Sequence, residues 1–195
     1  HERTSVVCLT TPSRCIYEKQ LKGFPHEQKF GLVSSHTTSS KEEIDYDKEA
    51  AIMSFLLKLF ENKITDDRLF LIPTMQGEHW MLIAVNLDTP KIYFLDSMHG
   101  YPTNRPRMMA FVNLAVHQYR LMHGMNPGHK DEQVYKIYNR KSIQCPKQTN
   151  RKDCGYYVCK FMKEIVFHQQ TSIPDEYYHD RRKNSYSEDD IDVFR

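Results

Sequence analysis

The order of apolar and polar residues along the chain predicts three helices. Between residues 48 and 60, apolar side chains recur at steps of three and four, which is the period of an amphipathic helix. Pro106 fits the first turn of a second helix over residues 107–123, which Gly124 ends. A third helix is expected to begin near Asp153. Its apolar face has offsets of 4, 7, 8 and 11 and consists of Cys154, Val158, Phe161, Met162 and Ile165.

Short apolar runs predict three strands, over residues 69–72, 80–85 and 92–95. Pro73 is expected to stop the first of them. Weaker patterns suggest two more strands, over 134–139 and 143–145. Because the three main runs are apolar throughout rather than alternating, we expect strands that are covered on both faces. Helix, strands, helix, strands and helix in this order predict an α+β domain.

Composition limits the class of protein. A chain of 195 residues has the size of one domain, or of two small ones at most. It is 39% hydrophobic and 12% aromatic, which is too much for a disordered chain, and no apolar run reaches the roughly 18 residues that a membrane span needs. The formal net charge of +2 gives no strong field, so we expect neither nucleic acid nor membrane as a partner. The chain begins with His1, and we expect it to be an excised domain or a gene fragment.

The five cysteines indicate a reducing compartment. They are odd in number and irregularly spaced, which argues against a disulfide framework. Neither a CxxC nor an HExxH motif occurs, so we expect no metal and no other cofactor.

Cys154 stands where a loop turns into the third predicted helix. The unpaired N–H groups at such a helix start favour a thiolate, which is the nucleophilic form of cysteine. Asp153 would oppose this by its like charge, so we expect its carboxylate to point away, as the N-cap of the helix. Alternatively, Cys154 is simply a small buried residue.

His79 and Asp96 form a second candidate pair. His79 precedes one predicted strand, and Asp96 ends the next, 17 residues later. If the two strands pair as a hairpin, both residues lie at one end of the sheet. The carboxylate could then hold the imidazole by Nδ1–H and leave Nε2 to take a thiol proton. Alternatively, His79 is an ordinary loop histidine and Asp96 a turn former, and Trp80 would by default belong to the core.

Gln148 lies six residues before Cys154, in the loop ahead of the helix. Its amide and the backbone N–H of Cys154 could together stabilise a developing oxyanion. The plainer interpretation is a solvated loop glutamine.

Taken together, these residues resemble a known family. The arrangement His79-Trp80, Asp96-Ser97 and Q-x-N-x-x-D-C-G around Cys154 resembles the ubiquitin-like-protein proteases, which include the SUMO proteases and are related to adenovirus proteinase. The similarity covers roughly residues 45 to 170 and points to a divergent member of the type found in plants or mobile elements.

The resemblance implies roles for the candidate residues. His79 would be the general base, Asp96 its orienting acid, Cys154 the nucleophile and Gln148 the oxyanion donor. Trp80 would lie over the substrate tail. The implied fold is a papain-like α+β arrangement with a central mixed sheet and the nucleophile at the N-terminus of a buried helix.

The resemblance also implies substrates and organisation. The substrate would be a SUMO-like modifier ending in Gly-Gly, and the protein a monomer in the nucleus or cytoplasm, with the nucleus favoured. Residues 1–40 would be an N-terminal extension, 41–175 the cysteine peptidase catalytic domain and 176–195 a charged C-terminal segment. The family often has a second tryptophan in its early helix. Here Tyr46 and Phe55 are the nearby aromatic candidates.

Two other functions remain open at this point. An acetyltransferase could use the same His, acid and Cys order and pass through an acyl-cysteine. A catalytically weak domain could instead only bind a ubiquitin-like protein.

Overall fold

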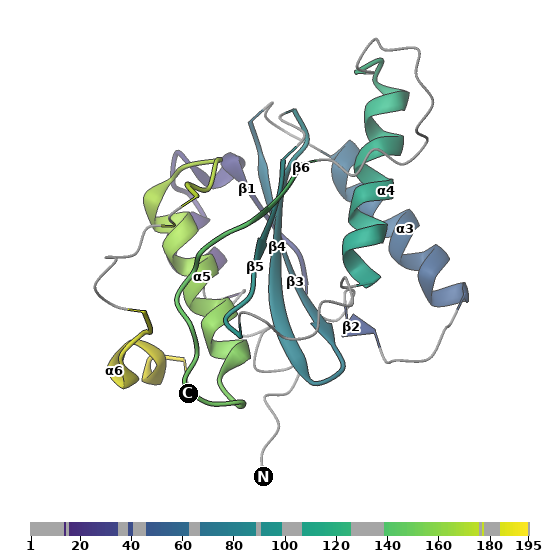
Figure 1. Ribbon diagram of the computed structural model, residues 1–195. Helices are drawn as coiled ribbons and strands as arrows, with labels where there is room; N and C mark the ends of the chain where they lie inside the picture. Colours follow the sequence, from purple (N-terminus) through teal and green to yellow (C-terminus); the bar gives the residue numbers. More distant parts are fainter. Residues whose placement is uncertain are drawn as a thin grey trace.

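The computed structural model describes residues 14, 16–34, 39–40, 46–62, 67–88, 91–98, 107–125, 139–175, 177 and 184–194. Cys8, Cys15, Pro106 and residues 134–138, which enter the expectations above, lie outside this described part. The described elements form three layers, with a sheet in the middle and helices on each of its faces (Figure 1).

The central sheet is mixed, as expected for the papain-like arrangement. It contains β1 (Phe30–Leu32), β2 (Ser39–Ser40), β3 (Leu69–Gln76), β4 (His79–Asn86), β5 (Lys91–Leu95) and β6 (Asn139–Ser142). The strand order is β1-β3-β4-β5-β6, and β2 also pairs with β3. The pairs β3–β4 and β4–β5 are antiparallel, whereas β1 and β2 run parallel to β3, and β6 runs parallel to β5.

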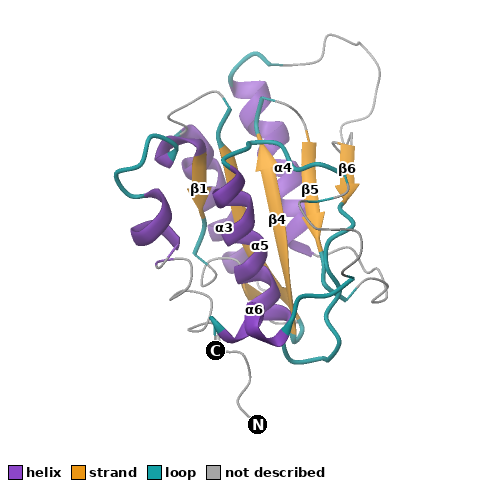
Figure 2. Ribbon diagram, turned by 90° about the vertical axis from the view of Figure 1, so that its left-hand side faces the viewer, coloured by secondary structure: helices purple, strands orange, loops and turns teal. Residues whose placement is uncertain are grey.

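Helices cover both faces of this sheet. The helix α5 (Cys154–His168) lies on one face, and α3 (Tyr46–Glu61) and α4 (Arg107–Met122) lie together on the other (Figures 1 and 2). The chain also forms a short π-helix η1 (Tyr17–Leu21), a 3-10 helix η2 (Glu27–Lys29) and α6 (Glu188–Asp192). The three long helices are those that the sequence predicts.

Both sides of β4 are covered, which explains its apolar sequence. All eight residues of the strand are buried. Leu82 and Ala84 belong to the core cluster on the α5 side, and Ile83 and Val85 to the cluster on the α3 and α4 side. Side chains that alternate between two apolar layers leave no polar face, so the prediction of strands covered on both faces is confirmed.

Two strand predictions are wrong in detail. The first strand does not stop at Pro73, because β3 continues to Gln76 and Pro73 stands opposite Leu82. On the other side of β3, β1 pairs with residues 69–71 and β2 with residues 75–76, so Pro73 falls between these two partners and its missing N–H interrupts neither. The strand expected at 143–145 is also absent, since β6 ends at Ser142 and residues 143–148 carry no regular structure.

Residues from both ends of the described chain pack around α5. Ile16 and Leu21 from the N-terminal part, and Tyr186 and Ile191 from the C-terminal part, belong to the same core cluster as the buried face of this helix. The capping box of α6, formed by Ser187 and Asp190, fixes the start of that short helix.

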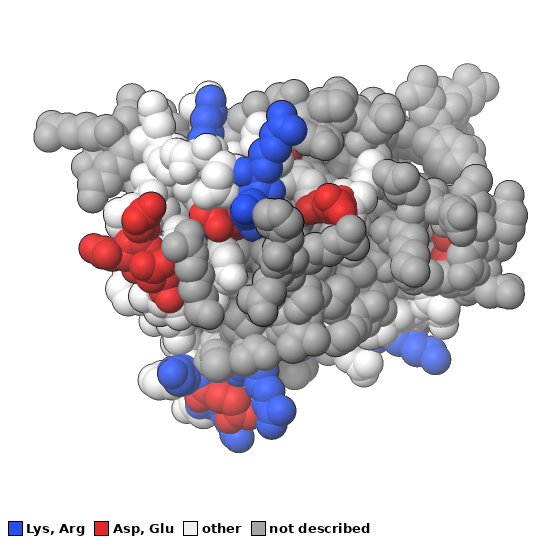
Figure 3. Space-filling view, turned by 90° about the horizontal axis from the view of Figure 1, so that it is seen from below, with Lys and Arg blue, Asp and Glu red and all other residues white. Residues whose placement is uncertain are grey.

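The face seen from below carries several groups of charged side chains. One group of acidic side chains lies at the left, the side on which α6 lies in Figure 1, and acidic and basic side chains are mixed in a group at the bottom edge (Figure 3). α6 supplies Glu188, Asp189, Asp190 and Asp192. Within the described ranges, no helix combines the length and the apolar character that crossing a membrane requires.

Candidate active site

His79 and Asp96 meet at one end of the sheet. β4 begins with His79, β5 is followed by Asp96, and the antiparallel register that pairs Leu82 with Leu95 places both residues at the same end. The Nε2 atom of His79 lies 2.7 Å from Oδ1 of Asp96. The same carboxylate oxygen accepts a hydrogen bond from the backbone N–H of Met98 at 2.8 Å, which fixes its orientation. The expected placement of the pair is therefore confirmed.

The nitrogen that contacts the acid differs from the expectation. Asp96 holds Nε2, so the ring nitrogen left for a thiol is Nδ1, which is the reverse of the assignment predicted from the sequence. The reason is geometric. Asp96 directly follows the neighbouring strand β5, and from there its carboxylate meets the Nε2 side of the imidazole.

Cys154 lies beside this pair. It is the first residue of α5, is 3% exposed, and its Sγ is 4.0 Å from the carbonyl oxygen of Glu78, the residue before His79. Burial lowers the pKa of His79, but hydrogen bonds to Asp96 and Cys154 and their negative charges outweigh it and raise this pKa from 6.5 to about 9. At neutral pH the ring therefore favours its protonated form next to the sulfur.

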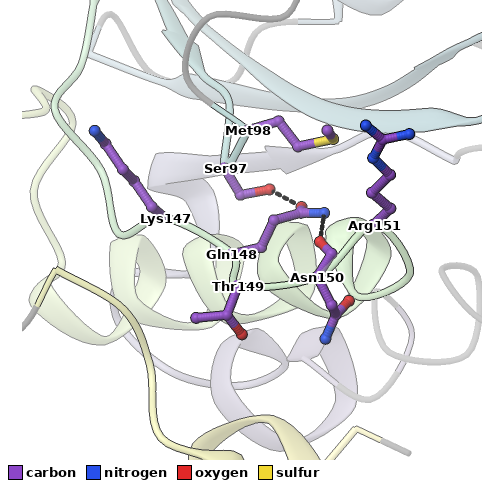
Figure 4. A pocket seen from close by; sticks show the side chains of 7 residues that line it. All are labelled: Ser97, Met98, Lys147, Gln148, Thr149, Asn150 and Arg151. Carbon is purple, nitrogen blue, oxygen red and sulfur yellow. Dashed lines mark hydrogen bonds between the residues drawn. The ribbon is translucent and has the colours of Figure 1, made fainter.

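Gln148 is held by Ser97, the neighbour of Asp96. The Ser97 hydroxyl donates to Oε1 of Gln148 (Figure 4). The backbone N–H of Gln148 donates to the Ser97 carbonyl at 2.9 Å. The side-chain Nε2 of Gln148 donates to the carbonyl of Asn150. These residues line an open pocket of about 210 Å³ together with Met98, Lys147, Thr149 and Arg151 (Figure 4).

Asn150 organises the turn that leads into α5. Its Oδ1 accepts from the backbone N–H groups of Lys152 and Asp153, at 2.8 and 3.1 Å. Its Nδ2 donates to Oδ2 of Asp153 at 2.7 Å. Asp153 occupies the N-cap position, as predicted, but its side chain makes no capping bond and is held by Asn150 instead. Sequence reasoning missed the roles of Asn150 and Ser97, although both stand inside the motifs that it used.

Trp80 lies in the core. It is 1% exposed, belongs to the cluster on the α5 side, and its indole N–H is buried with no hydrogen-bond partner in the described part of the chain. Phe55 packs against the cluster on the opposite face of the sheet. The structure therefore brings His79, Asp96 and Cys154 together and ties Gln148 to the segment after Asp96. It buries Trp80 in the core and places Phe55 on the face of the sheet opposite to Trp80.

The comparisons with known proteins agree with this fold. A papain-like α+β fold with a buried cysteine beside a histidine and an acid is that of a cysteine protease. The model of the Ulp1 protease family, C-terminal catalytic domain, matches residues 57–192, which is more than half of the chain. The chain belongs to the Ulp1 protease family. It is a cysteine protease that acts on ubiquitin-like proteins, as that family does.

Solved structures show the same fold at low sequence identity. The effector protein XopD of Xanthomonas campestris bound to ubiquitin is 14% identical, with a TM-score of 0.59, over 86% of this chain and 76% of that one. The SUMO protease Ulp1 with its catalytic cysteine oxidised to a sulfinic acid is 16% identical, with a TM-score of 0.59, over 100% and 74%. The Ulp1 protease domain in complex with Smt3, the yeast ortholog of SUMO, is 16% identical, with a TM-score of 0.53, over 89% and 68%.

Proposed function

We propose that this protein cleaves after the C-terminal Gly-Gly of a SUMO-like modifier, through Cys154, His79, Asp96 and Gln148. The observation that carries the proposal is the imidazole of His79, which is bound to Asp96 through Nε2 at 2.7 Å and has the thiol of the first residue of α5 beside it. A thiol next to a histidine that an acid orients, at the start of a helix, is the arrangement that nucleophilic catalysis by cysteine requires.

The reaction follows from the positions of these groups. Because the His79 ring is protonated at neutral pH, the Cys154 thiol has given its proton to Nδ1 before substrate binds, and the thiolate attacks the glycine carbonyl carbon. The oxyanion accepts hydrogen bonds from the Gln148 amide and the backbone N–H of Cys154. The carbon–nitrogen bond breaks as His79 returns the proton to the leaving amine, which leaves a thioester on Cys154. Water, deprotonated by His79, then hydrolyses the thioester to a carboxylate and the free thiol.

Asp96 stabilises the protonated ring at each of these steps. A ring whose pKa is about 9 accepts the thiol proton readily and still releases it to an amine, the stronger base. Since the nucleophile must be a free thiol, we extend the proposal to a reducing compartment, the nucleus or the cytoplasm. Cys145, Cys154 and Cys159 are all free cysteines.

The identity of the modifier is supported by the relatives. One of them is bound to ubiquitin and another to Smt3, the yeast ortholog of SUMO. Both SUMO-like proteins and ubiquitin therefore belong in the first assay, and we propose that the SUMO-like modifier is preferred.

The test uses ubiquitin-like modifiers that carry an electrophilic trap at the C-terminal glycine. Each is incubated with the wild type and with Cys154→Ala. We expect a covalent adduct with a SUMO-like modifier that is absent in the variant. Selective labelling of Cys154 by iodoacetamide without any modifier adduct would overturn the substrate assignment but keep the nucleophile. An adduct that persists in Cys154→Ala would overturn the role of Cys154.

A further inference from the structure

Ser97 is a buried polar residue for which the reaction above has no use. It is 1% exposed and follows Asp96 directly. It contacts Gln148 twice, since its hydroxyl donates to Oε1 and its carbonyl accepts from the backbone N–H at 2.9 Å. The two residues are 51 positions apart in the sequence, so these contacts join the end of β5 to the loop before α5.

The partners of Gln148 determine which way its amide faces. The carbonyl of Asn150 can only accept a hydrogen bond, so the amide atom that faces it must be Nε2. Oε1 then faces Ser97, and the hydroxyl of Ser97 must donate to it. With Oε1 occupied and one N–H used on Asn150, the second N–H of Nε2 is the group left to donate to a substrate. A hydroxyl at position 97 therefore helps to leave a donor, rather than an acceptor, as the unused group of the amide.

We propose that Ser97 is a positioning residue, whose hydroxyl holds the amide of Gln148 in the orientation that stabilises the oxyanion. This inference rests on the proposed role of Gln148. It makes residues 96–98 a single orienting turn, because Asp96 sets the imidazole, Ser97 sets the amide, and the N–H of Met98 fixes the Asp96 carboxylate at 2.8 Å.

The inference predicts a specific pattern of kinetic effects. Without the hydroxyl, Asn150 alone restrains the amide, which then rotates more freely. For Ser97→Ala we expect kcat to fall about 5- to 10-fold, the usual effect of one hydrogen bond, with KM nearly unchanged. The rate at which iodoacetamide alkylates Cys154 should stay within about twofold of wild type. Alkylation forms no oxyanion, so it reports the thiol and imidazole but not Gln148.

A double-mutant cycle decides between positioning and a general structural effect. If Ser97 acts through Gln148, Ser97→Ala has no further effect on kcat once Gln148→Ala is present. Ser187→Ala is the matched control. It removes the N-cap hydroxyl of α6, which bonds Asp190 rather than Gln148, and we expect its kcat to equal that of wild type. Thermal melting of every variant confirms that each is folded at the assay temperature.

Three results would overturn the inference and leave the proposed role of Gln148 in place. The first is a loss of kcat from Ser97→Ala that is as large in the Gln148→Ala background as in the wild type. The second is a parallel loss of iodoacetamide reactivity, which would show that Ser97 acts through Asp96. The third is a full kcat in Ser97→Ala while Gln148→Ala is impaired. If Gln148→Ala itself changes kcat less than threefold, the proposed role of Gln148 fails, and the inference about Ser97 fails with it.

Discussion

Nε2 of His79 and Oδ1 of Asp96 are 2.7 Å apart, and this contact ties the first residue of β4 to the first residue after β5. Their side chains are 8% and 17% exposed, so little solvent screens the attraction between them. The contact therefore controls the protonation of His79 as well as its orientation, and it can be tested through pH.

Asp96→Asn removes the negative charge but keeps the shape of the side chain. We expect the pKa of His79 to fall below its wild-type value of about 9, because the charged ring loses its partner while burial still disfavours it. Activity that needs a protonated ring is lost as pH rises through this pKa, so the alkaline limb of the pH–rate profile moves to lower pH. NMR titration of the imidazole and kcat/KM against pH measure the two effects.

Asp88→Asn is the matched control for this change. Asp88 lies in the turn that follows β4, at the other end of the sheet, and the same substitution there should leave the titration of His79 unchanged. An unchanged His79 pKa in Asp96→Asn would contradict the role assigned to Asp96.

Gln148→Ala tests the proposed oxyanion donor directly. Removing one such donor costs about 10²–10³ in kcat, and we expect a loss in this range with little change in KM. Gln144→Ala, the same substitution at an exposed position of the same segment outside the pocket, serves as the control and should keep nearly full activity. Steady-state cleavage of a modifier with a C-terminal reporter group measures both variants.

Tyr186 anchors the C-terminal segment to α5. It is 8% exposed, its hydroxyl donates to Glu164, and its ring lies 5.1 Å from that of Tyr157. Tyr186→Ala should lower the free energy of unfolding by about 3 kcal/mol, as loss of a buried aromatic ring does, and urea denaturation measures it. Phe167→Ala, at a position of α5 that is 73% exposed, should change it by less than about 0.5 kcal/mol. Equal effects of the two variants would show that the segment does not dock.

Gly31 allows β1 to approach β3 closely. It pairs with Phe70, and a Cβ atom added to it would overlap Cδ1 of that ring and lie 2.8 Å from Cε1. Because Phe70 is 1% exposed and packs on Phe60, the ring has little room to move. Gly31→Ala should therefore destabilise the protein by about 1–3 kcal/mol in thermal or urea unfolding.

A substitution of Phe70, the residue that Gly31 contacts, tests whether the clash with its ring causes the loss of stability. Phe70→Leu removes the ring that the new Cβ would meet, so the double variant should lose less stability than the sum of the two single variants. Additive losses would mean that the clash is not the cause.

Local pattern was enough to predict the helices and the main strands. The apolar runs that became β4 and β5 bury side chains on both faces, so their sequence alone carries the signal. The end of β3 could not be predicted in this way. Whether Pro73 breaks a strand depends on which neighbours need its N–H, and those neighbours, β1 and β2, come from a distant part of the chain.

The same limit applies to the candidate site, where only part of the geometry could be predicted from local sequence. His79 and Asp96 could be placed together because one stands at the start of a strand and the other at the end of the next, but the nitrogen that meets the acid depends on the orientation of the ring. The sequence alone assigns no role to Ser97, since its partner Gln148 is 51 residues away and no local pattern reports such a contact. Trp80 was expected at the substrate by resemblance alone, whereas its apolar neighbours in the strand place it in the core.

The enclosure of α5 by both ends of the chain has a consequence for synthesis. Leu21 leaves the ribosome early and Ile191 late, yet both belong to the core cluster around the helix that begins with Cys154. Since a chain emerges and folds from its N-terminus, this helix cannot complete its packing while the C-terminal segment is still being translated. A nascent chain would therefore carry its reactive cysteine without the packing that surrounds it in the finished protein, and peptidase activity would begin only after translation has passed Ile191.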